Sequence, residues 1–213
     1  MRLNRLMFLI ATTVLLGAGA GILTTATGWW LHVPWFAGMV SGAFFATTSL
    51  MGFWAYLTLN FVARVTLPRR VWRWAQALVL AIVLYDMLYW RYHLHAASAG
   101  EDPALFWTSF WQGLWPLAPA LAGAFAKQRL SGKGSFLPAL FFLYVFTILD
   151  SLPFIWLQYG WSQSSSLVNQ TLLVVMACNL YLILVFGKLL NRPEGAGSSV
   201  MAEPMETGRD GTS

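Results

Sequence analysis

The sequence predicts an all-α protein, a polytopic integral membrane helix bundle of about six transmembrane helices with both termini in the cytoplasm (N-in/C-in). Of its 213 residues, 58% are hydrophobic and only 10% are charged, whereas an ordinary soluble domain has roughly 25% charged residues. The apolar residues form six long runs, and the basic residues between the runs collect on one side. A soluble domain of this size could not bury so much apolar surface. The expected surroundings are therefore the lipid bilayer, and the expected location is the cell membrane, crossed several times.

The six runs are each long enough to cross a hydrocarbon core of ~30 Å as a helix. A closed barrel would need strict alternation of apolar and polar residues, which these runs lack. Residues 1–192 are therefore expected to form a transmembrane bundle. Its helices are predicted near residues 7–28, 35–62, 71–91, 105–126, 136–158 and 167–190.

The first run has a charged start, an apolar centre and small residues near Ala20, as a cleavable secretory signal does. Cleavage there would leave five crossings. The apolar stretch nevertheless continues to the aromatic pair Trp29 and Trp30. This length favours an uncleaved first helix.

The second run carries small residues at intervals of four, four, three and three, which places them on one face of a helix. Such a stripe lets two helix backbones approach closely. It serves either packing within the bundle or contact with a partner's membrane helix, and both interpretations remain open at this point. The residues of this stripe are Gly38, Gly42, Ala46, Ser49 and Gly52.

Lys and Arg collect on the cytoplasmic side of membrane proteins. Eleven basic residues lie on one side of the six predicted crossings, which puts both termini in the cytoplasm. They form no continuous stripe or arm, so no nucleic-acid partner is expected. These residues are Arg2, Arg5, Arg64, Arg69, Arg70, Arg73, Lys127, Arg129, Lys133, Lys188 and Arg192.

The third run contains Asp86, and a carboxylate within a membrane helix indicates a functional site by default. Tyr89, Trp90 and His93 follow at helical spacings of three, four and seven residues, so they share its face. One interpretation is a proton- or signal-sensitive site in which His93 or His95 titrates near neutral pH. The favoured interpretation is that these polar groups satisfy one another close to the headgroups.

The fourth run stacks Trp107, Trp111 and Trp115 on one face and then carries Pro116 and Pro119. An aromatic stripe of this kind is more often packed or lipid-facing than ligand-binding. The prolines are expected to kink the helix.

The fifth run contains the second intramembrane carboxylate, Asp150. Counted along a straight helix from Phe136, it lies ~21 Å from the cytoplasmic start, in the outer half of the membrane and in the same layer as Asp86. Its carboxylate is expected to bond to Asn179 of the sixth run or to a carbonyl freed by Pro153. The single cysteine, Cys178, allows no disulfide within the chain and is expected to be a buried apolar residue.

After Arg192 the chain fills with Gly, Pro, Ser and acidic residues. Residues 193–213 are therefore predicted to be a disordered cytoplasmic tail.

Motifs of catalysis are missing from the sequence: it has no H-E-x-x-H, no G-x-S-x-G, no Walker loop and no dinucleotide glycine fingerprint. His93 and His95 two residues apart are only a weak metal signal. We therefore expect no enzyme, no cofactor and no metal site.

Several stretches resemble the KinB-signalling pathway activation protein family of spore-forming bacteria. They span nearly the whole membrane region in order, although none is a mechanistic motif. The stretches are "GILTTATG" (21–28), "SLMGFWAYLTLN" (49–60), "YDMLYWRY" (85–92), "FLPALFFLYVFTILDSLPF" (136–154) and "ACNLYLIL" (177–184).

This resemblance implies a non-enzymatic membrane protein that activates a membrane sensor histidine kinase feeding the sporulation phosphorelay. The implied partner is that kinase, contacted through membrane helices, with the second helix as the expected surface. The alternative is a small transporter or channel that uses Asp86 and Asp150 as proton or cation sites.

Overall fold

The computed structural model describes residues 3–27, 34–90, 103–160 and 165–190. Helices and short turns account for all of these residues, and no strand occurs among them, as the all-α prediction requires. In chain order the elements are α1 (Leu3–Ala26), α2 (Trp35–Thr66), α3 (Arg69–Tyr85), η1 (Asp86–Trp90), α5 (Pro103–Leu114), α6 (Leu117–Ser131), η2 (Lys133–Ser135), α7 (Phe136–Phe141), η3 (Phe142–Phe146), α8 (Thr147–Gly160) and α9 (Ser165–Leu190).

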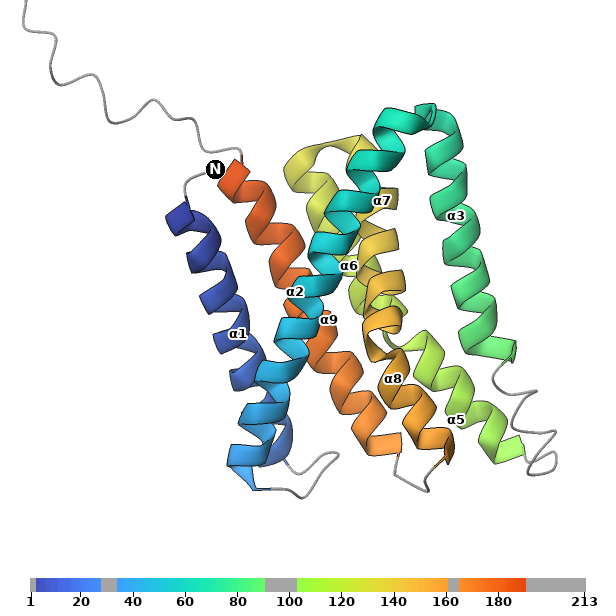
Figure 1. Ribbon diagram of the computed structural model, residues 1–213. Helices are drawn as coiled ribbons and strands as arrows, with labels where there is room; N and C mark the ends of the chain where they lie inside the picture. Colours follow the sequence, from blue (N-terminus) through green and yellow to red (C-terminus); the bar gives the residue numbers. More distant parts are fainter. Residues whose placement is uncertain (1–2, 28–33, 91–102, 161–164, 191–213) are drawn as a thin grey trace, which may run out of the picture.

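Each of the six predicted apolar runs is occupied by helix, and the chain passes up and down the bundle (Figure 1). The start of α1, the connection from α2 to α3, the connection from α6 to α7 and the end of α9 all lie at one end of the bundle. This end carries basic residues on four elements, and we call it the basic end. Its described basic residues are Arg5, Arg64, Arg69, Arg70, Arg73, Lys127 and Arg129.

Local sequence sets where these helices begin and end. Proline precedes both α2 and α3, and Leu67, the residue before Pro68, is extended, because proline disfavours the helical conformation in its predecessor. Helix α6 ends at Gly132, whose φ of 93° is one that residues with a Cβ rarely adopt.

Five of the described helical stretches are long and apolar enough to cross a membrane: Asn4–Ala26, Trp35–Thr66, Arg69–Tyr89, Phe136–Pro153 and Val168–Gly187. The fourth predicted run is not a single helix. It breaks at Trp115 and Pro116 into α5 and α6. The kink predicted from the prolines is therefore a break, and α5 and α6 together occupy the run in place of one continuous helix.

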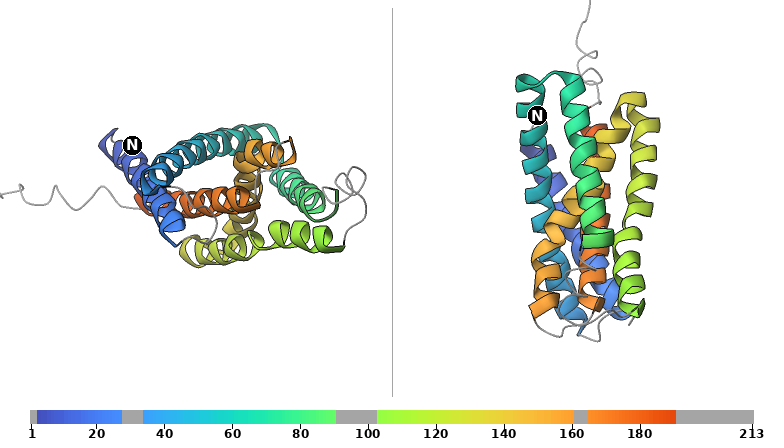
Figure 2. Two further views of the ribbon diagram at one scale, coloured as in Figure 1. Left: turned by 90° about the horizontal axis from the view of Figure 1, so that it is seen from below. Right: turned by 90° about the vertical axis from the view of Figure 1, so that its right-hand side faces the viewer.

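Helix α9 is the centre of the bundle. Viewed along the helices, α2 covers one side of α9, α5 and α6 cover the other, and α1 and α3 lie at opposite ends (Figure 2, left). The side chain of Cys178 on α9 is fully buried, as expected. Aromatic rings fill the space between α2 and η3: the ring centroids of Phe53 and Phe142 are 5.5 Å apart, and those of Tyr56 and Phe142 are 4.8 Å apart.

Helices α1 and α2 touch through glycine. A Cβ added to Gly21 would lie well inside 3.0 Å of the Gly38 carbonyl oxygen, and one added to Gly42 would do the same at the Gly17 carbonyl oxygen. Real Cβ atoms essentially never come so close. The two backbones are therefore in direct contact, which only small residues permit.

Candidate functional site

A group of buried polar side chains joins α2, α8 and α9 at the middle of the bundle. The Ser49 hydroxyl donates a hydrogen bond to Asn179 Oδ1 over 2.5 Å, and Asn179 Nδ2 donates to Thr147 Oγ1 over 3.0 Å. All three side chains are fully buried. We call Ser49, Thr147, Asp150, Ser151 and Asn179 the polar cluster.

Asp150 lies in a niche that Gly52 provides. A Cβ on Gly52 would lie 2.7 Å from both carboxylate oxygens of Asp150, so the carboxylate rests against the α2 backbone. Asn179, the partner that the sequence suggested for Asp150, forms its hydrogen bonds with Ser49 and Thr147, so the bond between Asp150 and Asn179 stays a prediction. Asp150 Oδ2 is buried and has no hydrogen-bond partner among the described residues.

The polar cluster lies well inside the bundle. Ser49 lies 14 residues after the start of α2 at Trp35, and Asn179 lies 14 residues after the start of α9 at Ser165. Both are near the midpoints of their helices. The position predicted for Asp150 in the outer half of the membrane stays a prediction.

The π-helical turn η3 lies directly before the polar cluster. Such turns insert one extra residue into a helix and are frequent at functional sites. Tyr144, at the centre of η3, is fully buried and donates its hydroxyl hydrogen bond to the Gly113 carbonyl of α5 over 2.9 Å. Ser151, one turn further on, bonds back to the Thr147 carbonyl over 2.8 Å.

Asp86 begins a second π-helical turn, η1, which continues α3. Tyr89 is 46% exposed and packs its ring against Tyr85 with centroids 5.4 Å apart. His93 and His95 lie outside the described residues, so the proposed face of Asp86, Tyr89, Trp90 and His93 stays a prediction.

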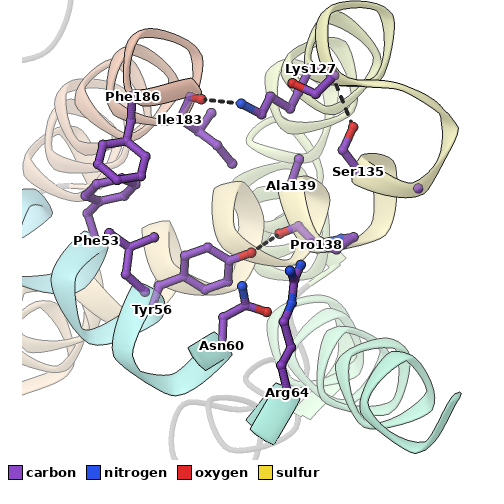
Figure 3. A pocket seen from close by; sticks show the side chains of 13 residues that line it. Phe53, Tyr56, Asn60, Arg64, Lys127, Ser135, Pro138, Ala139, Ile183 and Phe186 are labelled. Atoms are coloured by element: carbon purple, nitrogen blue, oxygen red, sulfur yellow. Dashed lines mark hydrogen bonds between the residues drawn. The ribbon is translucent and has the colours of Figure 1, made fainter. Parts of the chain in front are cut away.

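A pocket of about 420 Å³ opens at the basic end between α2, α6, α7 and α9 (Figure 3). Arg64 and Lys127 approach it from different helices, and Asn60 and Ser135 add polar groups. Lys127 Nζ donates to the Ile183 carbonyl over 3.1 Å. Burial lowers the pKa of Lys127.

Two comparisons with known proteins agree on a family. The family described as KinB-signalling pathway activation in sporulation matches residues 8–189. The chain belongs to this family. The KinB-signaling pathway activation protein of Bacillus subtilis (strain 168) is 28% identical over 155 residues, which cover 72% of this chain and 73% of that protein. No solved structure matches the chain.

The matched region of this KinB-signalling pathway activation family member contains both the polar cluster and the pocket at the basic end. Of the small-residue stripe on α2, all five members are buried within the chain: Gly38, Gly42, Ala46, Ser49 and Gly52. Helix α1 covers its first part, and Asn179 and Asp150 cover Ser49 and Gly52. The stripe therefore packs this family member's own helices together.

Sequence reasoning missed Thr147 and Ser151 of the polar cluster. Their signal was present, because Thr147 lies three residues before Asp150 and Ser151 lies four residues after Thr147, so each shares a helical face with another member of the cluster. It also treated Arg64 and Lys127 only as orientation charges. The structure alone shows why they differ from ordinary end charges: a Cβ on Gly187 would collide with Lys127 Nζ, so the glycine leaves room for the lysine.

No group of three or more His, Cys, Asp or Glu side chains is placed to hold a metal within the part of the chain that the structure describes.

Proposed function

We propose that this chain is a non-enzymatic regulator in the cell membrane that activates a membrane sensor histidine kinase feeding the sporulation phosphorelay. The family and the B. subtilis relative support a role in the KinB signalling pathway. Five helices that are long and apolar enough to cross a membrane support a location in the membrane. The basic end faces the cytoplasm in this arrangement, which keeps both termini inside.

Contact with the kinase is proposed to run through helix α3. Only Gln76 is buried along Arg69–Tyr85, and α3 stands at one end of the bundle (Figure 2, left). The other described membrane-length helices bury more of their surface against the chain, so α3 has the most surface left for a partner.

Six of the exposed apolar side chains of α3 and η1 form one stripe along the helix. They recur at intervals of three, four, four, three and four residues, which keeps them within one face of the helix. Three of the six are Trp or Tyr, the residue types that carry most binding energy at protein interfaces. The residues of this stripe, which we call the α3 stripe, are Val71, Trp74, Leu78, Ile82, Tyr85 and Tyr89.

The small-residue stripe of α2 is a weaker candidate for the kinase contact. A partner helix could reach Gly38 or Gly42 only after displacing α1 from their backbones. The α3 stripe requires no such displacement.

Photo-crosslinking tests this proposal. A benzoylphenylalanine is placed at Leu78 on α3 or at Leu15 on α1, which are 62% and 71% exposed respectively. They lie about 14 Å and 18 Å from the basic end of their helices, and α3 and α1 stand at opposite ends of the bundle. We expect a crosslinked sensor kinase from Leu78 and none from Leu15, in membranes of sporulating cells. Equal yields from both positions, or no kinase from either, would contradict direct contact through α3.

A second candidate function is a small transporter or channel that uses Asp86 and Asp150. The buried, unpartnered Oδ2 of Asp150 favours it, since intramembrane carboxylates mark ion pathways. Proton and cation flux into proteoliposomes would be compared between the native chain and the Asp86→Asn/Asp150→Asn variant. Flux that the two substitutions abolish would support transport. Equal flux, together with normal sporulation of the variant, would remove this candidate.

A further inference from the structure

We infer that the pocket at the basic end binds the headgroup of an anionic phospholipid from the cytoplasmic leaflet, with Arg64 and Lys127 on either side of its phosphate. This inference rests on the membrane placement proposed above. Basic pockets between membrane helices on the cytoplasmic side are the sites at which anionic headgroups bind.

The charge of the pocket is not balanced by the chain. Its lining contains two cations, Arg64 and Lys127, and no acidic residue. Arg64 makes no hydrogen bond or ion pair with the residues that the structure describes. Lys127 gives one of its three donors to the Ile183 carbonyl, which leaves two for a ligand. A phosphate would supply the missing negative charge and accept these donors.

The walls of the pocket suit a molecule that is polar at one end and apolar at the other. Phe53 and Phe186 lie together on one side of the pocket, and Leu57 adds to its apolar lining. Asn60 lies near Arg64, and Ser135 lies near Lys127 (Figure 3). The Tyr56 hydroxyl is engaged with the Pro138 carbonyl over 3.1 Å and closes one edge. A volume of about 420 Å³ falls within the ~300–1,000 Å³ of small-ligand sites.

The depth of the pocket matches a lipid headgroup. Arg64 lies 15 residues beyond Ser49, which is near the middle of α2. Fifteen residues of helix span ~22 Å, whereas the hydrocarbon half-thickness is only ~15 Å. In the proposed membrane placement, with the middle of α2 at the bilayer centre, the guanidinium reaches the phosphate layer, and the apolar wall around Phe53 lies within the acyl-chain region.

Lipid retention tests the inference. The full chain, delipidated in mild detergent, is incubated with vesicles of equal parts phosphatidylglycerol and phosphatidylcholine and repurified, and the retained lipids are counted by mass spectrometry. We expect at least a threefold enrichment of phosphatidylglycerol. The enrichment should fall in Arg64→Gln, disappear in Arg64→Gln/Lys127→Gln and persist in Arg64→Lys. Inorganic phosphate at millimolar concentration should not displace the lipid, because it lacks the acyl chains.

The matched control is Arg69→Gln/Arg129→Gln, which removes the same amount of positive charge from the basic end but changes no residue that lines the pocket. No enrichment in the native chain, or equal loss in this control, would overturn the inference, and displacement by free phosphate would show a phosphate site instead. Arg64 is exposed and without a described partner, so Arg64→Gln is expected to keep the fold, which circular dichroism checks.

Membrane fractionation separates the two proposals. Recovery outside the membrane would overturn the placement, whereas recovery in it without enrichment would overturn the lipid site alone.

Discussion

Replacing Gly21 by Ala tests whether the backbone contact between α1 and α2 holds the bundle together. The added Cβ would meet the Gly38 carbonyl oxygen well inside 3.0 Å, and the Gly38 carbonyl carbon and Gly42 Cα at 3.0 Å each. All of these are backbone atoms that cannot rotate away. The two helices would have to separate by about 1 Å to restore ordinary van der Waals contact. Backbone shifts of this kind are the usual response to an added carbon in a tightly packed contact.

The expected cost follows from that separation. Overpacking of a well-packed contact typically costs about 1–3 kcal/mol. The contact between α1 and α2 is the most extensive between any two described helices, so we place Gly21→Ala in the upper half of this range. The matched control is Gly19→Ala, two residues away on the same helix, where nothing lies within 4 Å of the added Cβ. There the substitution is expected to be neutral or to stabilise by up to about 1 kcal/mol, because Ala is the better helix former.

The assay is unfolding of the purified chain in mixed micelles of mild detergent and increasing dodecyl sulfate, followed by circular dichroism. Gly21→Ala should shift the midpoint to lower dodecyl sulfate, and Gly19→Ala should not. Equal midpoints for the two variants would refute the direct backbone contact, since the two substitutions are chemically identical and differ only in what the methyl group meets.

The remaining predictions concern buried polar groups. Both polar atoms of the buried Gln76 side chain lack a hydrogen-bond partner among the described residues, so Gln76→Leu should stabilise the chain by about 1–3 kcal/mol in the same assay, and destabilisation would contradict this. The 2.5 Å bond between Ser49 and Asn179 should give a coupling energy of about 0.5–2 kcal/mol in a double-mutant cycle of Ser49→Ala and Asn179→Ala, and additive single effects would show no coupling. Tyr144→Phe removes the bond to the Gly113 carbonyl and should destabilise by about 1 kcal/mol, which an unchanged midpoint would contradict.

Most of the fold prediction rested on the length of the apolar runs. Six apolar runs predicted six regions of helix because each helix must satisfy its own backbone in lipid, and this depends on local sequence alone. The break at Pro116 could not be predicted from the length of the run. An apolar run tells how much chain the membrane can hold, but not whether proline bends the helix there or divides it into α5 and α6.

Contacts between distant residues were predicted less well. The small residues of α2 indicated close helix approach, but the pattern on one helix does not say which helix approaches. The bonds of Asn179 to Ser49 and Thr147 were not predicted, because the sequence does not say which of several polar residues on other helices a buried amide will meet. The sequence could not predict that Arg64 and Lys127 line the same pocket, because both residues fit equally well as orientation charges at the end of a helix.

The distribution of contacts separates a firmly packed part of the bundle from a lightly held one. Backbone contact joins α1 to α2, and the polar cluster joins α2, α8 and α9, whereas α3 leaves one face open along its whole length. A regulator can bias a kinase only by contacting one of its states more favourably than the other. In the proposed function, the kinase is contacted through the open face of α3. Under that proposal, changes at Gly21 should alter how much folded protein is present, while changes in the α3 stripe should alter what each folded molecule does to the kinase.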